Sequence, residues 1–175
     1  DGVLSDWDGF NVLPVQIIQL NSLSKPGLPQ SKSDLSALFR CFSDTDFLYF
    51  AVNVTDDKLI FGEEPFGSPF NDDCVELLIY GDKTGLSPIK MWVSAFKDGK
   101  VRLEGREPQE KITYPYMWSK QGVLAGLKRN DTGYDVEIAV PRKVLEIIGW
   151  RNEKVLNLNV SVYDDDNGGK YESIL

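Results

Sequence analysis

Aromatic and acidic side chains stand together near the middle of the chain, where they could form a ligand site or a cation site. Phe70, Asp72 and Asp73 directly precede an alternating apolar segment that contains Glu76. The ring offers a flat apolar face and the carboxylates offer oxygen atoms to a hydroxyl group or a cation. Successive side chains of a strand point to opposite faces, so Glu76 is expected on the face opposite to Val75. A rigid strand would therefore fix its position.

Further runs of acids predict a divalent cation site. Adjacent carboxylates repel each other, and a bound cation would relieve that repulsion. The candidate ligands are Asp56, Asp57, Asp164 and Asp166. The run at 164–168 lacks the bidentate glutamate of an EF-hand loop, so backbone carbonyls and other loops would have to complete the site. The alternative is a set of solvated acidic turns.

Composition excludes several classes of function. The chain has 19 Lys and Arg against 27 Asp and Glu, a formal net charge of -8, and no histidine. The negative charge disfavours nucleic acid as a partner. Without histidine, the commonest general base and the Ser-His and Cys-His nucleophile pairs are absent. Asp135 and Glu137 share one face of a predicted strand, but such pairs are usually solvated, so no enzyme is predicted.

The elements that must position these residues are β-strands. The 175 residues are near the usual size of one domain, so residues 1–175 are expected to form a single one. Alternating or continuous apolar runs occur at 15–20, 37–43, 47–55, 74–80, 89–96, 101–104, 122–128, 134–140 and 155–163. Short turn signals at 43–46, 97–100 and 130–133 predict hairpins.

The predicted fold class is all-β, an antiparallel two-sheet β-sandwich of the jelly-roll kind with one short connector helix. Pro141 begins that helix and Gly149 ends it. No apolar run is long enough for a membrane span.

The two cysteines and the N-terminal residues are the features that relate to the cellular compartment. Cys41 and Cys74 both fall in predicted strands, where they would form either a disulfide or two buried thiols. The chain begins at Asp1 without an apolar signal segment, so any secretion signal is expected to have been removed or to lie outside this chain.

Five segments, in this order, resemble the family 9 carbohydrate-binding modules over nearly the whole chain. They are residues 1–7, 46–57, 71–76, 133–141 and 164–168. The resemblance implies an antiparallel β-sandwich with bound calcium. It also implies recognition of sugar ends in a slot between two tryptophans, on modules attached to secreted polysaccharide-degrading enzymes.

The resemblance also assigns candidate roles to individual residues. Phe70 takes the position of the family's first tryptophan, and Glu76 matches its strand glutamate, an acceptor for sugar hydroxyls. Tyr163 and Tyr171 are the aromatic residues nearest the position of the second tryptophan, while Trp92 and Trp118 are candidates for a replacement platform. The candidate ligand-binding residues are thus Phe70, Glu76, Trp92, Tyr163 and Tyr171.

Three functions follow as hypotheses. The first is non-catalytic carbohydrate binding by a module of a larger extracellular or cell-surface protein that processes polysaccharides, tethered to its other domains. The second is a structural or adhesion spacer with a degenerate sugar site. The third is a haem-binding electron-transfer domain, for which only Met91 and Met117 offer sulfur ligands.

Overall fold

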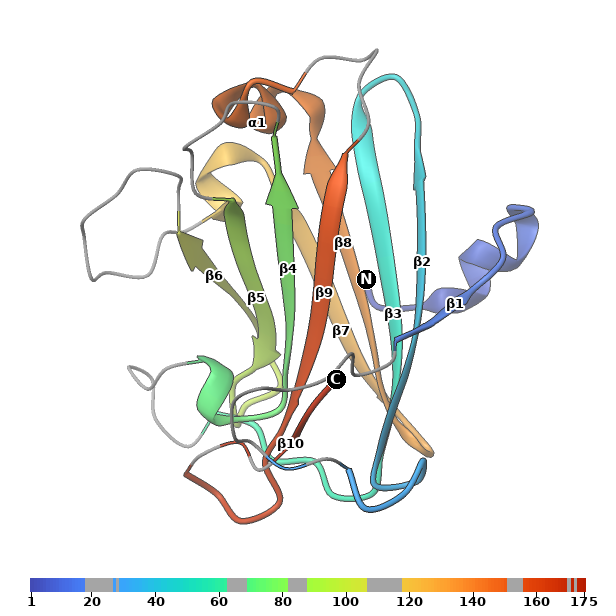
Figure 1. The fold of residues 1–175 in the computed structure, drawn as a ribbon, viewed down its shortest axis with the longest axis vertical. Helices are drawn as coiled ribbons and strands as arrows, with labels where there is room; N and C mark the ends of the chain where they lie inside the picture. Colours follow the sequence, from blue (N-terminus) through green and yellow to red (C-terminus); the bar gives the residue numbers. More distant parts are fainter. Residues whose placement is uncertain are drawn as a thin grey trace.

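Two antiparallel sheets of five strands each pack face to face in the computed structural model (Figure 1). The structure describes residues 1–17, 27, 29–62, 69–81, 88–106, 118–150, 156–169, 171 and 173–175. The antiparallel β-sandwich expected from the sequence is therefore confirmed.

We call the two layers sheet A and sheet B. Sheet A has the strand order β1 (Val15–Ile17), β2 (Leu35–Ser43), β3 (Phe47–Asp56), β8 (Gly133–Pro141) and β7 (Leu124–Asn130). Sheet B has the order β10 (Ser173–Ile174), β9 (Asn157–Asp164), β4 (Cys74–Tyr80), β5 (Ile89–Ala95) and β6 (Val101–Arg106).

Local sequence signals account for most of these elements. All nine predicted strands are present, although residues 18–20 of the first and residue 155 of the last lie outside the described part. The three predicted turns join β2 to β3, β5 to β6 and β7 to β8. The connector helix consists of α1 (Arg142–Leu145) and the 3-10 turn η4 (Glu146–Ile148). It ends at Gly149, whose φ of 75° is the left-handed conformation that glycine adopts without strain. Strand β10 was not predicted, because two residues carry no alternation.

The core lies between the sheets and explains why β4 is so strongly patterned. Val75, Leu77 and Ile79 are at most 1% exposed and point into it. Trp118, in the 3-10 helix η3 (Trp118–Gln121), is fully buried. Its Nε1 donates a hydrogen bond to the backbone oxygen of Lys90 at 2.7 Å. Trp118 is thus a core residue and is unavailable as an exposed platform.

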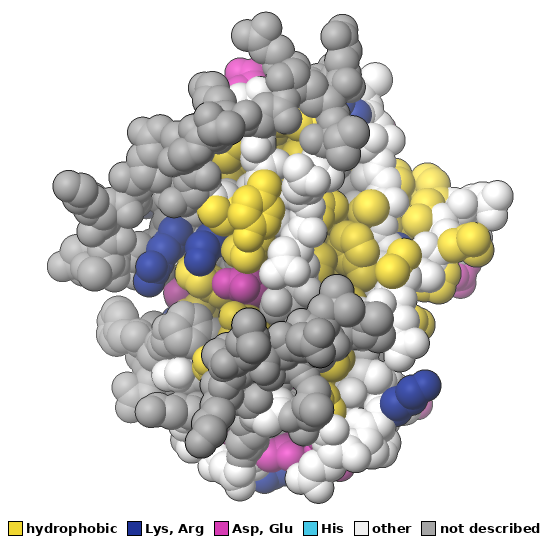
Figure 2. Space-filling model, viewed as in Figure 1, with side chains coloured by type: hydrophobic (Ala, Val, Ile, Leu, Met, Phe, Trp, Pro, Cys, Tyr) yellow, Lys and Arg dark blue, Asp and Glu magenta, His cyan; other side chains and the backbone are white. Residues whose placement is uncertain are grey.

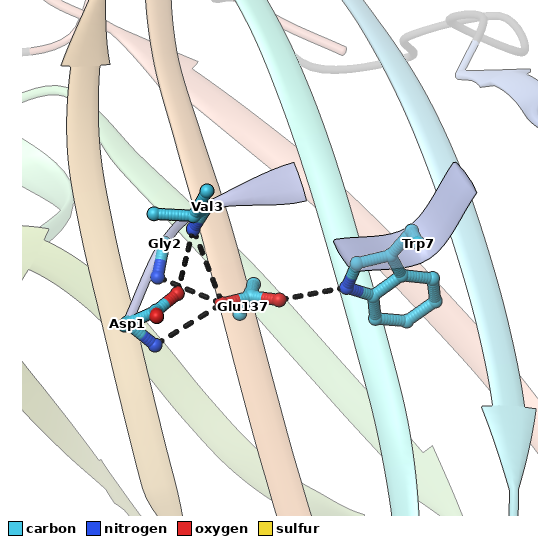
Figure 3. Close-up of polar contacts among 5 residues, drawn as sticks. All are labelled: Asp1, Gly2, Val3, Trp7 and Glu137. Atoms are coloured by element: carbon cyan, nitrogen blue, oxygen red, sulfur yellow. Dashed lines mark hydrogen bonds and ion pairs between the residues drawn. The ribbon is translucent and has the colours of Figure 1, made fainter. Parts of the chain in front are cut away.

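The outer face of sheet A is crossed by the chain's own first residues, which Glu137 holds in place (Figure 3). Its Oε1 accepts a hydrogen bond from Trp7 Nε1 at 2.7 Å, and its Oε2 accepts one from the backbone nitrogen of Gly2 at 2.7 Å. Asp135, two residues earlier, accepts a hydrogen bond from Asn53 Nδ2 at 2.6 Å. The expectation that these carboxylates are merely solvated is wrong for both.

The two cysteines are both free thiols, so of the two alternatives the disulfide is excluded in this structure. Cys41 lies on β2 of sheet A and is exposed, whereas Cys74 lies on β4 of sheet B and is buried. The alternative of two buried thiols is therefore confirmed for Cys74 and wrong for Cys41. Among the described residues, no helix is long and apolar enough to cross a membrane.

Candidate functional site

The outer face of sheet B carries two cross-strand rows of side chains that could contact a ligand. In the first row, Glu76 of β4 pairs with Trp92 of β5 on one side and Ser161 of β9 on the other, and Trp92 pairs with Glu104 of β6. The second row consists of Asn159, Leu78, Lys90 and Arg106. Figure 2 shows hydrophobic, acidic and basic side chains gathered on this face. Polar groups therefore surround apolar ones, as in many small-molecule sites.

Glu76 is the central acceptor of this face. Its side chain is nearly buried, and its Oε1 accepts a hydrogen bond from Trp92 Nε1 at 2.9 Å. Its Oε2 accepts a longer one from the Tyr163 hydroxyl at 3.3 Å. Burial raises the pKa of Glu76, while nearby Lys90 and the two hydrogen bonds act to lower it. Strand pairing and these donors fix the carboxylate, as the alternation of β4 predicted.

The other predicted ligand residues have different environments. Tyr171 packs edge-on against Tyr163, with the ring centroids 5.0 Å apart. Trp92 is only 7% exposed, and the guanidinium of Arg106 lies 5.9 Å from its ring centroid. Trp92 thus serves as a hydrogen-bond donor to Glu76 and as a support for Arg106. The backbone of Phe70 belongs to η2 (Pro69–Asn71), and its side chain lies outside the described part of the structure.

Sequence reasoning missed the basic residues of this face. Arg102 is 3% exposed, and its Nε lies 2.6 Å from Glu104 Oε1 in an ion pair. Lys90 and Arg106 lie directly opposite each other on β5 and β6. The alternation of both strands could have placed these residues on the outer face. The register that brings them together was not readable from the sequence.

A second cluster lies at the end of the sandwich opposite α1, where the predicted metal ligands meet. Asp56 ends β3 of sheet A and Asp164 ends β9 of sheet B. One carboxylate oxygen from each of these and one from Asp166 lie within 4.8 Å of one another. Asp166 also belongs to a second such group, with Asp57 and Asp34. All four predicted ligands are thus brought together, and Asp34 joins them.

The electrostatics of this cluster fit a cation. Asp56 Oδ2 and Asp164 Oδ1 are buried and accept no hydrogen bond from the residues that the structure describes. Burial is the main cause that raises the pKa of Asp56 to about 6 and that of Asp164 to about 7, and neighbouring carboxylates add to it. Buried carboxylate oxygens without donors are costly unless a cation or a proton neutralises them.

Three other acids bind backbone groups instead of joining the cluster. Asp73 is fully buried and accepts hydrogen bonds from the backbone nitrogens of Ile60 and Asp165. Burial is the main cause that raises its pKa to about 9. Asp72 accepts one from Gly62 at 3.0 Å. The carboxylate of Asp165 accepts hydrogen bonds from the backbone nitrogens of Asn167, Gly168 and Gly169. These acids order the loops around the cluster.

Sheet A has a cavity of its own, of about 460 Å³, beneath the N-terminal segment. Trp7, Phe10 and Tyr49 line it, together with four acids, Asp1, Asp6, Asp44 and Glu137. Glu137 accepts the hydrogen bonds described above, and Asp44 accepts bonds from the Tyr49 hydroxyl and two backbone nitrogens. Glu137 and Asp44 are thus engaged within the fold, and apolar side chains form much of the cavity's lining.

Comparison with known proteins agrees with this architecture. A family model described as carbohydrate family 9 binding domain-like matches residues 7–175. A comparison with curated proteins found no match.

Among solved structures, the chain is similar to a family 9 carbohydrate-binding module from Caldicellulosiruptor kristjanssonii in complex with cellotriose. The identity is 14%, the TM-score is 0.61, and the match covers 99% of this chain and 76% of the other. It is also similar to a module of that family from the same organism in complex with glucose, at 13% identity and a TM-score of 0.53, over 93% of this chain and 80% of the other. A Bacteroides uniformis protein proposed to bind carbohydrate gives 11% identity and a TM-score of 0.58, over 96% and 78%.

Proposed function

The chain belongs to the carbohydrate family 9 binding domain-like family, and from that premise we propose that it binds a saccharide on the outer face of sheet B. The observation that carries the proposal is Glu76, a nearly buried carboxylate on the outer face of a central strand. An ionised carboxylate has about four acceptor positions. Trp92 and Tyr163 donate to Glu76 in the structure. The remaining capacity suits the hydroxyl groups of a sugar, which form strong bonds with a charged acceptor.

Calorimetric titration with cellotriose and with glucose tests this proposal. We expect saturable binding that weakens about tenfold or more in a Glu76→Gln variant, since a hydrogen bond to a charged group contributes about 1.5–3 kcal/mol. The amide keeps the shape of the side chain and one acceptor oxygen, so the fold is retained. Glu146→Gln, an exposed position on η4, is the matched control and should bind like the parent protein. Equal affinity in the Glu76→Gln variant would remove Glu76 from the site.

The setting of this module is part of the proposal. We infer a non-catalytic, extracellular or cell-surface module of a larger protein that processes polysaccharides, supported by its membership of a carbohydrate-binding family. A spacer without a functional sugar site is the second candidate, and absence of binding across a glycan panel would favour it. The haem hypothesis loses support because Met91 is fully buried in the core, while Met117 lies outside the described residues.

We further propose that calcium binds the acidic cluster. Asp56, Asp164 and Asp166 would hold it, with Asp34 and Asp57 beside them. Calcium takes six to eight oxygen ligands in a flexible geometry, and these carboxylates begin to supply them. A cation bound to the folded state alone raises its stability. Added calcium should therefore raise the melting temperature of chelator-treated protein, and Asp164→Asn should abolish the rise. An unchanged melt would show that the cluster holds no calcium.

A further inference from the structure

Two cations face each other on the proposed sugar-binding surface, and they indicate which saccharide it accepts. Resting on the function proposed above, we propose that the ligand is an anionic saccharide whose carboxylate or sulfate group binds between Lys90 and Arg106. The two residues form a direct cross-strand pair on β5 and β6, in the row next to Glu76 and Trp92. Figure 2 shows basic side chains on this face beside acidic and hydrophobic ones.

The first argument is the cost of this pair. Like charges directly opposite each other on neighbouring strands destabilise a sheet. Among the residues that the structure describes, neither Lys90 nor Arg106 forms an ion pair with a carboxylate. Arg106 instead lies over the Trp92 ring. A bound anion would offset the repulsion between Lys90 and Arg106 and supply both side chains with a negative partner.

The second argument is that the two nearby acids, Glu104 and Glu76, form no ion pair with Lys90 or Arg106 in the described part of the structure. Glu104 forms its ion pair with Arg102, on the neighbouring outward position of the same strand. Glu76 accepts hydrogen bonds from Trp92 and Tyr163. Lys90 acts on Glu76 only at longer range, by lowering its pKa. The local charge available to a ligand is thus positive at Lys90 and Arg106, although the whole chain carries a net charge of -8.

The third argument is geometric fit. The guanidinium of Arg106 presents planar donors that suit two oxygens of a carboxylate or sulfate, and Lys90 adds a point charge. Glu76 lies in the adjacent row, where it would accept hydroxyl groups of the same sugar ring. The anionic group of the saccharide would therefore lie against Lys90 and Arg106, while hydroxyl groups of the same ring would lie against Glu76. A uronic acid carries a carboxylate and hydroxyl groups on a single ring.

Calorimetric titrations at pH 7 with matched probes test the inference. The probes are glucuronate, its neutral methyl ester, glucose and glucose 6-sulfate. We expect glucuronate to bind roughly fivefold to tenfold more tightly than its ester, as for a partly exposed charge-assisted contact. The comparison of glucuronate with glucose 6-sulfate identifies which anion is preferred.

Two variants and one control locate the effect. Lys90→Gln and Arg106→Gln should each reduce the preference for glucuronate over its ester to twofold or less. Lys128→Gln, an exposed position on β7 of sheet A, makes the same charge change away from the face and should leave the preference intact. A thermal melt shows whether Lys90→Gln folds. If it does not, the Arg106→Gln variant and the comparison of glucuronate with its methyl ester still test the inference.

The outcomes separate this inference from the function it rests on. Binding of glucose and of the ester with no preference for either glucuronate or glucose 6-sulfate would overturn the anionic ligand and leave saccharide binding intact. A preference that persists in both glutamine variants would overturn the role of Lys90 and Arg106. Absence of binding for every probe would overturn both proposals.

Discussion

Replacing Glu137 by alanine should release the first residues of the chain from sheet A. Oε1 of this carboxylate accepts a hydrogen bond from Trp7, and Oε2 accepts one from Gly2, both at 2.7 Å (Figure 3). A hydrogen bond to a charged group contributes about 1.5 kcal/mol or more, so the loss of these two costs about 3 kcal/mol. Longer bonds from Asp1 and Val3 add little to that figure.

This loss should appear first as local detachment. The segment that includes η1 (Leu4–Gly9) packs on the outside of sheet A, so it can separate while the core between the sheets stays intact. Trp7 is 4% exposed and would enter water, which shifts its fluorescence to longer wavelength. Hydrogen exchange would show faster exchange at Gly2 and Val3 than in the parent protein.

Two comparisons make the test specific. Glu137→Gln keeps one acceptor for Trp7 and loses the charge, so it should cost about 1.5 kcal/mol, half as much as alanine. Burial acts to raise the pKa of Glu137, but its hydrogen bonds and the nearby amino group outweigh burial and lower it. The anchor is therefore complete above the ordinary glutamate pKa and is lost as the pH falls through the lowered value. Unchanged Trp7 emission and exchange in Glu137→Ala would refute the anchor.

Three further predictions concern the other parts of the fold. Gly105→Ala should destabilise the protein by about 3 kcal/mol in urea unfolding, because the added methyl group would overlap the backbone oxygen of Lys90 and the Trp118 indole; a change below 0.5 kcal/mol would contradict this packing. In the presence of a chelator, the free energy of unfolding should fall as the pH rises from about 4 to 7. The pKa values of Asp56 and Asp164 are raised in the folded state to about 6 and 7. Over this pH range the folded protein therefore binds more protons than the unfolded chain, and stability falls as those protons are lost. Added calcium should stabilise the protein most at pH 8. If the free energy of unfolding in chelator instead rises between pH 4 and 7, the raised pKa values are wrong. Tyr163→Phe should weaken cellotriose binding only a few-fold and cost less than about 1 kcal/mol of stability, since its bond to Glu76 is long at 3.3 Å; a loss as large as that in Glu76→Gln would make Tyr163 a principal ligand.

The strands were predictable because each carries its pattern within a few residues. The alternation of Val75, Leu77 and Ile79 also predicted the outward direction of Glu76, and the structure bears this out. Strand β10, with two residues, is too short to show a pattern. What alternation cannot provide is the register between neighbouring strands. The meeting of Lys90 with Arg106 depends on that register.

The acidic cluster shows the same limit in another form. The adjacent acids predicted a common site, and Asp56 and Asp164 do meet there because β3 and β9 end at the same end of the sandwich. Asp34 was missed, since it stands alone before β2 in a serine-rich segment. Within the run 164–166, the middle acid turns to backbone nitrogens of its own loop. The sequence shows the run of three acids, but only the folded loop shows which of them belong to the cluster.

Because β4 alternates strictly, the outer face of sheet B should tolerate substitutions but not insertions within the strand. Substitutions at outward positions, such as Glu76 on β4 or Lys90 on the neighbouring β5, alter the proposed ligand face without reaching Val75 or Leu77 beneath it. Insertion of a single residue within β4 would instead turn Glu76 toward the core and a core valine toward the outer face. Lineages of this module should therefore diversify their ligand preference by point substitution, with length changes confined to the loops between strands.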